Sequence, residues 1–373
     1  MDNTRPTRVL LVYSYYHHHF MVERLASIMA GYGISIELLC TDNYITTLRS
    51  PGLWLMRHAG LLGNTRLVHR LFERCIFPAL VRRFDLVDFH VFTSSRLPLM
   101  RACKSKGIPF DITPWGTDVL RSSREYLDEQ AEGFDACRYI KSALSLQDAI
   151  SEAYGGKYDA KIRTVYWGQT GFEVIDSIGP DALGRFRKSL PLEEGDITVC
   201  CGYNAFIAQQ HVPILKALAT LPESLRQRIF LLVPMTYPPD PKYVGEVKSV
   251  AEKSGLRHKV YDRYMTAEDV AAMRIATDVV VNMQITDAFS GSLQGHLYAG
   301  GVLVIGEWLN YPMLDGIGAY YIKTNFDTLA DVLQDVLTKL PEYKRRCRGN
   351  REKISGLTSW PAVAPAWADS YKL

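Results

Sequence analysis

The sequence predicts a doubly wound α/β protein that is built from two domains. Short apolar runs alternate with helical segments along the chain, which is the pattern of parallel strands connected by helices. A mixed segment with Gly179, Pro180 and Pro191 divides this alternation into two series. A chain of 373 residues is also too long for one ordinary hydrophobic core. The expected parts are an N-terminal domain at 1–175, a linker at 176–195, a C-terminal domain at 196–345 and a helical tail at 346–373 that packs back toward the N-terminal domain.

The first series opens with a β-α-β unit. The apolar run 8–13 predicts a buried parallel strand, and 34–39 predicts a second one. Between them, apolar residues from Val22 to Met29 have helical spacing, and Gly33 closes the helix. Such a unit predicts a right-handed crossover in an open parallel sheet. Further strands of this series are expected at 86–92, 108–112, 143–146 and 162–165.

The second series repeats the same alternation after the expected linker. Strands are expected at 197–202, 229–234, 260–261, 278–283 and 302–306, with helices at 213–221, 241–253, 267–275 and 292–298. Two successive series of this kind predict a pair of Rossmann-like domains that face a cleft.

Composition limits the possible partners. A net charge of +3 is too small to predict nucleic-acid binding. The seven Cys residues have no CxxC spacing, which favours a reducing, cytoplasmic location over a disulfide framework. The chain opens without a signal peptide, and no apolar run is long enough for a membrane span. Any membrane contact is therefore expected to be peripheral, at the inner face.

The densest functional signal is the segment 284–301. Asp287, Ser290, Gly291, Ser292 and Gln294 follow an apolar strand and lead into a helix. A loop of small residues at a helix N-terminus presents free backbone N–H groups and the positive end of the helix dipole, which suits a diphosphate. The alternative is that Ser290 is simply a helix N-cap. The loop by itself leaves both interpretations open.

A second loop, 202–211, follows the first strand of the second series. Gly202 and Asn204 suit a tight turn that can approach a phosphate closely. His211 is either a donor to that phosphate or an ordinary histidine at a helix N-terminus. Tyr237 lies in the loop after the next strand, where it is either a stacking residue for the base or sugar or a packing residue of the loop.

The segment 287–300, together with the strand 302–306, resembles the donor-binding segment of family-4 glycosyltransferases and their capsular-polysaccharide relatives. This resemblance implies a GT-B fold and a metal-independent, hexosyltransferase-like enzyme without a cofactor. It further implies that the enzyme moves a sugar, with retention, from a nucleotide-diphosphate sugar to a glycan or lipid-linked acceptor in bacterial surface polysaccharide synthesis. The family contacts the nucleobase from the loop that holds Arg263 and Tyr264 here.

The sequence departs from the family pattern at three places. The family has two carboxylates eight positions apart, whereas here Asp287 is followed at that distance by Gly295. Gln294 or His296 is expected to substitute for the second one. The family also carries an Arg and a Lys near the loop 202–211, which has neither. The third departure is Trp115, which stands where many members have a His.

The loop 115–118 resembles a conserved His-Gly-Ser/Thr-Asp loop of the family. Trp115, Gly116 and Thr117 are therefore expected on the acceptor side. Asp118 is expected, with Asp287, as a catalytic residue, either as general base or as an anchor for a sugar hydroxyl. The alternative for Asp118 is a helix N-cap, which is the commoner role of such a residue.

Two further features belong to the first series. Tyr15 and His17 follow the first strand and are expected on the acceptor side; neighbouring His residues point in different directions, so no metal is expected there. The segment 48–84 is rich in Arg and aromatic residues, with Glu73 as the one acidic residue. Such a mixture predicts either docking onto anionic lipid headgroups or ordinary amphipathic helices.

Two other whole-protein hypotheses stay open. A nucleotide-sugar 2-epimerase can share the same fold, although the recognisable signature of that family is missing from this sequence. A catalytically silent partner subunit is the other alternative, because Gly295, Trp115 and the missing Arg/Lys pair all depart from the family pattern.

Overall fold

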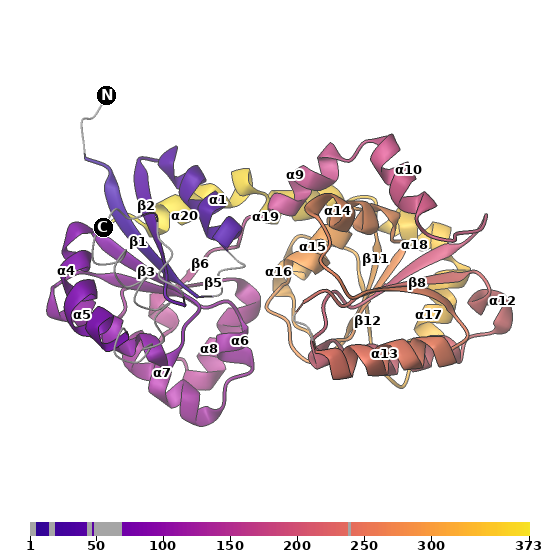
Figure 1. Ribbon diagram of the computed structural model, residues 1–373, viewed down its shortest axis with the longest axis horizontal. Coiled ribbons are helices and arrows are strands. Elements are labelled where there is room, and N and C mark those ends of the chain that lie inside the picture. Colours follow the sequence, from indigo (N-terminus) through magenta and orange to yellow (C-terminus); the bar gives the residue numbers. More distant parts are fainter. Residues whose placement is uncertain (1–4, 15–18, 43–46, 48–68, 238–239) are drawn as a thin grey trace. The chain divides into compact units, whose positions relative to one another are not determined.

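The computed structural model describes residues 5–14, 19–42, 47, 69–237 and 240–373. The chain divides into two compact units (Figure 1). Unit 1 comprises residues 1–168 together with 360–373, and unit 2 comprises residues 169–359. Within the described residues, no helix combines the length and the apolar character that a membrane crossing requires.

Unit 1 is built on a parallel six-stranded sheet with the order β2-β1-β3-β4-β5-β6. The side chains of β1 alternate, so Leu10 and Val12 enter one core and Val9 and Leu11 enter the core on the opposite face. Both faces of the strand are therefore buried, as the apolar run predicts. The strands are β1 (Thr7–Tyr13), β2 (Ile34–Cys40), β3 (Leu86–His90), β4 (Phe110–Thr113), β5 (Ile140–Ser142) and β6 (Ile162–Thr164).

Helices cover both faces of this sheet (Figure 1). The core that contains Val9 and Leu11 also contains Val22 of α1 and Trp367 of the C-terminal helix α20. The main helices of unit 1 are α1 (His19–Ala30), α4 (Phe77–Leu80), α5 (Leu97–Ser105), α6 (Thr117–Leu120), α7 (Arg124–Ala136), α8 (Leu144–Tyr154) and α20 (Trp360–Ser370).

One predicted strand of unit 1 is wrong. The range 143–146 begins helix α8, and the strand lies immediately before it at β5. The strand carries Lys141 at its centre, and this side chain is fully buried. A Lys interrupts the apolar pattern by which a buried strand is recognised, so the predicted strand begins at residue 143 and not at residue 140.

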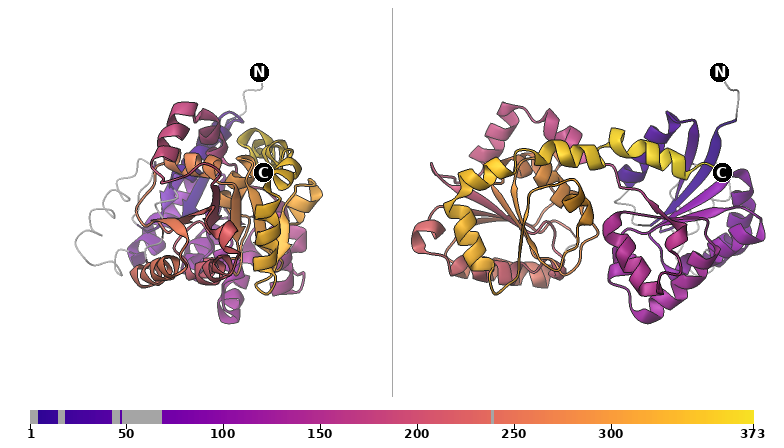
Figure 2. Two further views of the ribbon diagram at one scale, coloured as in Figure 1. Left: turned by 90° about the vertical axis from the view of Figure 1, so that its right-hand side faces the viewer. Right: turned by 180° about the vertical axis from the view of Figure 1, so that it is seen from behind.

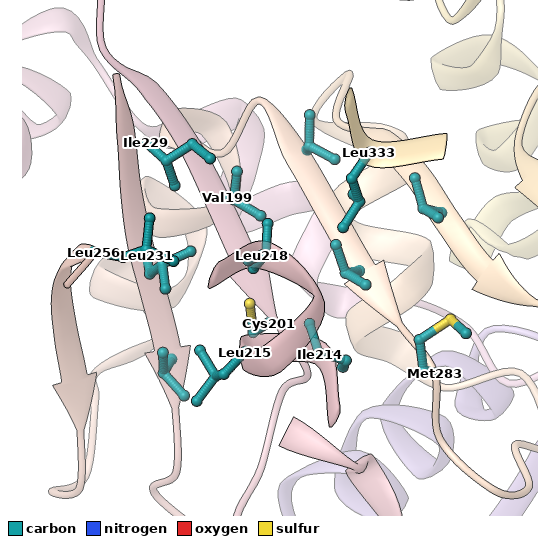
Figure 3. Packing of buried hydrophobic residues seen from close by; sticks show 14 of the residues in the cluster. Val199, Cys201, Ile214, Leu215, Leu218, Ile229, Leu231, Leu256, Met283 and Leu333 are labelled. Carbon is teal, nitrogen blue, oxygen red and sulfur yellow. The ribbon is translucent and has the colours of Figure 1, made fainter. Parts of the chain in front are cut away.

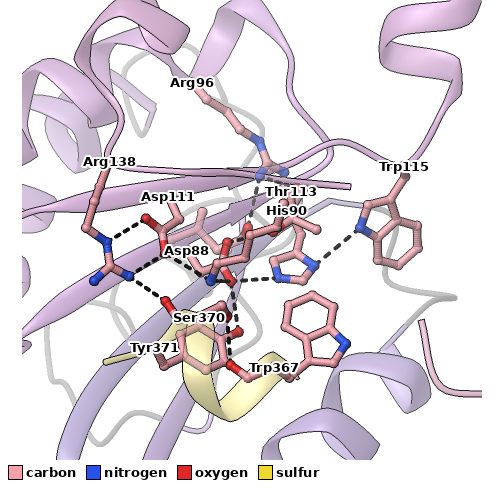
Figure 4. A network of polar contacts seen from close by, with 12 residues as sticks. Asp88, His90, Arg96, Asp111, Thr113, Trp115, Arg138, Trp367, Ser370 and Tyr371 are labelled. Carbon is pink, nitrogen blue, oxygen red and sulfur yellow. Dashed lines mark hydrogen bonds and ion pairs between the residues drawn. The ribbon is translucent and has the colours of Figure 1, made fainter. Parts of the chain in front are cut away.

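Burial of the Lys141 charge is possible because Asp88 and Asp111, which Figure 4 labels, both pair with it. Its ammonium group lies 2.9 Å from Asp88 and 3.0 Å from Asp111, which come from β3 and β4. The Tyr371 hydroxyl donates to Asp88 over 2.8 Å, and the ring of Tyr371 lies 3.8 Å from the Lys141 nitrogen. Arg138 pairs with Asp111 at 2.8 Å and donates to the Ser370 carbonyl over 2.6 Å. These contacts hold the end of α20 against the sheet of unit 1.

Unit 2 contains the second parallel six-stranded sheet, with the order β12-β11-β10-β7-β8-β9. Val199 and Cys201 of β7 and Leu231 of β8 point into one core with Leu215 and Leu218 of the neighbouring helix (Figure 3). The strands are β7 (Ile197–Cys201), β8 (Ile229–Pro234), β9 (Arg257–Tyr261), β10 (Val279–Asn282), β11 (Val302–Gly306) and β12 (Ile322–Thr324).

The order of strands reverses beside β7. The chain runs from β7 outward through β8 to β9, and then returns to place β10 on the other side of β7. In open α/β sheets, ligands bind outside the carboxyl ends of the strands at such a switch point. The helices of unit 2 are α9 (Thr170–Ser177), α10 (Pro180–Lys188), α11 (His211–Ala219), α12 (Glu223–Arg226), α13 (Pro241–Lys253), α14 (Ala267–Ala276), α15 (Gly291–Tyr298), α16 (Pro312–Gly316), α17 (Leu329–Thr338), α18 (Leu340–Arg346) and α19 (Asn350–Thr358).

The chain passes between the units at residues 168–169 and 359–360. The range 176–195, which the sequence predicted as the linker, belongs to unit 2, where it holds the end of α9 and all of α10. Phe186 of that range is buried. Of the predicted tail, α19 belongs to unit 2 and α20 to unit 1, as the yellow segments of Figure 2 show.

Candidate functional site

The candidate site of unit 2 lies at the switch point between β7 and β10. Gly202 follows β7 directly, and its N–H donates to the Val281 carbonyl of β10 over 3.1 Å. Its φ of +64° is a left-handed conformation that favours glycine. A Cβ atom here would lie 2.6 Å from Nε2 of His211. The turn therefore requires glycine for its backbone conformation and for the room that His211 needs.

A buried polar network joins the loop after β7 to the loop after β10. The Tyr203 hydroxyl donates to Oε1 of Gln284 over 3.1 Å, and Nε2 of Gln209 donates to the same oxygen over 2.8 Å. The Ile285 N–H also donates to the Ala208 carbonyl over 2.9 Å. These bonds fix the two loops against each other.

Helix α15 begins at this edge of the sheet. Ser290 is its N-cap, and the Ser290 hydroxyl accepts from the Leu293 N–H over 3.4 Å. The Asp287 carboxylate accepts from the Ser290 N–H over 3.1 Å and from the Tyr311 hydroxyl over 2.6 Å. The N–H groups of a first helical turn have no acceptor within the helix, and the dipole makes this end positive. Gly291 and Ser292 supply two of them, so the arrangement can bind an anion.

The structure thus brings most of the predicted donor residues together. Gly202, Asn204 and His211 lie in or after the loop that follows β7, while Asp287 and Ser290 to Gln294 lie after β10. Asn204 accepts from the Phe206 N–H over 3.0 Å, which shapes the loop. Nε2 of Gln294 donates to the Phe289 carbonyl over 2.8 Å, and Gln294 is buried.

The imidazole of His211 packs against Gly202 and is fully buried. Its Nδ1 lies 3.2 Å from the Tyr243 hydroxyl, and burial lowers the pKa of the imidazole to about 4. The ring is therefore neutral at pH 7. This position favours support of the turn at Gly202 over direct contact with a phosphate.

The predicted base-contacting residues lie further along the same edge. Tyr237 follows β8, is 40% exposed and packs edge-to-face against Phe206 at 6.3 Å between ring centroids. Arg263 and Tyr264 follow β9 at the edge of the sheet, and both are exposed. Tyr237 thus lies one strand away from the switch point, and Arg263 and Tyr264 lie two strands away.

Several exposed apolar residues of this edge were not predicted. Phe206 and Ile207 lie in the loop after β7, Ile285 in the loop after β10, and Trp308 in the loop after β11. Nε1 of Trp308 donates to the Gln284 carbonyl over 2.8 Å. Apolar residues at the carboxyl ends of several strands were the available signal, because such loops carry ligand contacts in this class of sheet.

Gly295 lies inside α15 and faces Arg274 of α14. A Cβ atom on Gly295 would lie 2.6 Å from Nη1 and 2.7 Å from Cζ of Arg274. The guanidinium therefore fills the room that a side chain at position 295 would need. His296 is 1% exposed, and burial together with the charge of Arg274 lowers the pKa of its imidazole to about 3. Arg274 was not predicted from the sequence.

In unit 1, Asp118 organises the loop that follows β4. Its carboxylate accepts from the N–H groups of Phe92 at 2.8 Å, Trp115 at 2.9 Å and Gly116 at 2.8 Å. Burial raises the pKa of Asp118, although the backbone donors oppose this shift. Because the carboxylate is 6% exposed and already accepts from three backbone N–H groups, its geometry favours anchoring of this loop over both expected catalytic roles, general base and anchor for a sugar hydroxyl.

Of the other residues of this loop, Trp115 and Thr117 are more accessible, whereas Gly116 is buried. Trp115 is half-buried, and its Nε1 donates to Nδ1 of His90 over 3.3 Å. Gly116 has a φ of +116°, and Thr117 is exposed. Tyr15 and His17 lie outside the described residues, as do residues 48–68 of the basic segment. Nowhere in the described residues do three or more His, Cys, Asp or Glu side chains gather in a way that could hold a metal.

No known family model and no curated protein matches the sequence. Solved structures do share its fold over nearly its whole length. HepE of Anabaena, solved with UDP and glucose, has a TM-score of 0.72 at 12% identity, with 98% of this chain and 99% of that chain covered. A glycosyltransferase from Rickettsia africae has a TM-score of 0.75 at 12% identity, with 99% and 98% covered. WaaG, a glycosyltransferase involved in lipopolysaccharide biosynthesis, has a TM-score of 0.67 at 14% identity, with 98% and 99% covered.

These neighbours establish the fold. Two parallel six-stranded sheets with interleaved helices, matched over nearly the whole chain, are the GT-B fold that the resemblance predicted. At identities this low the likeness extends to the fold and not to the activity.

Proposed function

We propose that this chain is a glycosyltransferase that moves a sugar from a nucleotide-diphosphate sugar to a glycan or lipid-linked acceptor. The observation that carries the proposal is the N-terminus of α15 at the switch point of the second sheet in a GT-B fold. Its first turn can hold a diphosphate, and HepE, which shares the fold, binds UDP and glucose. The proposed donor site therefore consists of Gly202, Asn204, Asp287 and the residues from Ser290 to Gln294.

The N-terminus of α15 would also assist the sugar transfer by stabilising the leaving group. When the bond between the anomeric carbon and the phosphate oxygen breaks, the nucleoside diphosphate leaves with additional negative charge. Backbone N–H groups and the positive end of α15 stabilise that charge in place. The acceptor oxygen forms the new glycosidic bond, and its proton passes to a phosphate oxygen of the leaving nucleoside diphosphate. Retention at the anomeric carbon, metal independence and a role in surface polysaccharide synthesis are parts of the proposal that rest on the resemblance to family-4 enzymes.

The proposed acceptor side is the loop after β4 in unit 1, with Trp115, Gly116 and Thr117. From the sequence alone, Tyr15 and His17 are also proposed as acceptor-side residues. For a lipid-linked acceptor, the basic segment 48–84 supplies peripheral contact with anionic lipid headgroups at the inner face of the membrane. Arg74 and Arg82 of its described part are exposed, in support of this contact.

The test is release of nucleoside diphosphate from UDP-, GDP- and dTDP-sugars in the presence of lipid-linked and free glycan acceptors, with and without EDTA. The proposal predicts acceptor-dependent turnover of at least one donor that EDTA leaves unchanged. Epimerisation of the donor without an acceptor would instead identify a 2-epimerase. Donor binding without turnover would identify a silent partner subunit, and absence of both binding and turnover would overturn the proposal.

A further inference from the structure

The side of α15 that faces α9 and α14 has glycine, and therefore no side chain, at positions 291 and 295. Gly291 and Gly295 lie one helical turn apart and therefore on the same side of the helix. A Cβ atom on Gly291 would lie 2.7 Å from Oε1 of Gln169, and one on Gly295 would lie 2.6 Å from Nη1 of Arg274. The same Nη1 lies 3.1 Å from the position of a Cβ on Gly171 in the first turn of α9. The Arg274 guanidinium is thus wedged between two helices at positions that lack side chains.

This guanidinium has no counterion among the described residues. Arg274 forms no ion pair with a described carboxylate, and its buried Nε has no hydrogen-bond acceptor there. Two acids close to these helices in sequence have partners elsewhere. Asp176 of α9 pairs with Arg351 and accepts from Tyr298 over 2.7 Å, and Asp278, which follows α14, lies 3.3 Å from Lys344.

The charge of Arg274 also persists at neutral pH. Burial lowers the pKa of its guanidinium to about 10, which leaves it protonated. The thiol of Cys200, whose electrostatic interaction with Arg274 slightly opposes that shift, cannot act as a counterion, because burial raises its pKa to about 12. A half-buried cation with no partner is unfavourable unless a ligand supplies the missing charge.

Other buried polar side chains of unit 2 are also unpaired. His296, which is 1% exposed, has no hydrogen-bond partner for either ring nitrogen among the described residues. Asn282, at the carboxyl end of β10, is 3% exposed and likewise has no described partner for its amide oxygen or nitrogen. Buried polar groups are nearly always hydrogen-bonded, so the unpaired nitrogens of His296, which interacts electrostatically with Arg274, indicate a site that a polar ligand completes.

We propose that Arg274 is the cationic residue that binds the phosphate groups of the donor. This inference rests on the proposed function, and it identifies the positive charge that the loop 202–211, without Lys or Arg, does not provide. The planar guanidinium suits two phosphate oxygens at once, and the nearby first turn of α15 supplies backbone N–H groups to the same anion. Gly295 is then required because any side chain there would displace the guanidinium.

The experiment is a titration of the diphosphate among UDP, GDP and dTDP that the wild-type protein binds, alongside the matching nucleoside. Arg274→Gln is expected to weaken binding of the diphosphate at least tenfold and to leave binding of the nucleoside unchanged. Arg274→Lys is expected to restore part of the loss. Arg345→Gln is the matched control, because Arg345 is an exposed arginine of the same unit, and it should bind like the wild type.

Two measurements separate a binding role from a structural one. Because Arg274 has no internal partner, Arg274→Gln should keep or raise the melting temperature, whereas a lowered melting temperature would indicate a structural role and overturn the inference. Gly295→Glu gives the guanidinium a carboxylate within the chain, so it should weaken binding of the diphosphate as well, and tighter binding would count against the inference. If Arg274→Gln binds the diphosphate with wild-type affinity, the inference is overturned and the proposed function is not. Failure of the wild-type protein to bind any nucleotide overturns the proposed function.

Discussion

At the scale of single residues, the two predicted catalytic acids have their carboxylates occupied by the protein itself. Asp118 holds three backbone N–H groups, and Asp287 holds the Ser290 N–H and the Tyr311 hydroxyl. The sequence identified the loops correctly as polar turns at strand ends. It could not show the partners, because Phe92 and Tyr311 are 26 and 24 positions away in the chain.

The first prediction concerns Asp118→Asn. An amide keeps one acceptor oxygen and places a donor group where the second one was, so at least one of the three N–H groups loses its acceptor. We expect the free energy of unfolding to fall by about 1–3 kcal/mol, measured by urea denaturation. Unchanged stability combined with loss of sugar transfer would instead support the role as general base.

The second prediction concerns Gly202→Ala. The φ of +64° and the approach of His211 to 2.6 Å both oppose a side chain, so we expect a loss of about 1–3 kcal/mol and weaker donor binding. Gly245→Ala in α13 is the control, because nothing lies within 4 Å of the added atom. That variant should gain roughly 0.5–1 kcal/mol. Equal stability of the two variants would show that the turn tolerates a side chain.

At the scale of elements, apolar runs predicted most strands to within a few residues. The strand β8 (Ile229–Pro234) and the strand β11 (Val302–Gly306) have the predicted bounds. The failures have physical causes. Lys141 interrupts β5, and its burial depends on Asp88 and Asp111, which are 53 and 30 positions away. The strand β12 (Ile322–Thr324) was missed because three residues around a Lys form no apolar run.

The third prediction concerns acid unfolding of unit 1. Burial on its own would raise the pKa of Asp88, but Lys141 and His90 outweigh it and hold the pKa well below its usual range. The ionised form of Asp88 therefore contributes stability that is fully present above about pH 4, the ordinary pKa of an Asp, and is lost as the pH falls further. The free energy of unfolding, measured between pH 7 and pH 3, should fall over the acidic part of this range.

The variant Asp88→Asn separates this network from the other carboxylates of the protein. It leaves the Lys141 charge without one of its two partners, so we expect a loss of about 3–5 kcal/mol at pH 7. Its stability should also depend less steeply on pH in the acidic range. A pH profile parallel to that of the wild type would contradict the role given to Asp88.

At the scale of the whole molecule, the two β-α series predicted the two sheets, and the neighbours confirm the GT-B fold. Placing the crossing between the units was harder. Gly179, Pro180 and Pro191 are typical of a linker, but Phe172 before them and Phe186 among them are buried in unit 2. Local composition cannot reveal such burial, because it depends on helices that fold against residues far along the chain.

The candidate site was predictable to a similar extent. The loops after β7 and β10 could be found from Gly, Ser and Asn at strand ends, since those residue types permit close approach to a ligand. Arg274 could not, because a single Arg in a helix is usually a solvated residue. Its importance follows from Gly295. In the sequence, Gly295 stands where the family has an acid, and in the structure its lack of a side chain leaves room for the Arg274 guanidinium.

The central claim is that unit 2 binds a nucleotide-diphosphate sugar at the N-terminus of α15. A crystal structure of the protein with the nucleoside diphosphate that it binds in solution tests this most directly. The claim predicts phosphate oxygens within hydrogen-bond distance of the backbone N–H groups of Gly291 and Ser292, with the Arg274 guanidinium on the same phosphates. Phosphates bound elsewhere, with the first turn of α15 unoccupied, would contradict it.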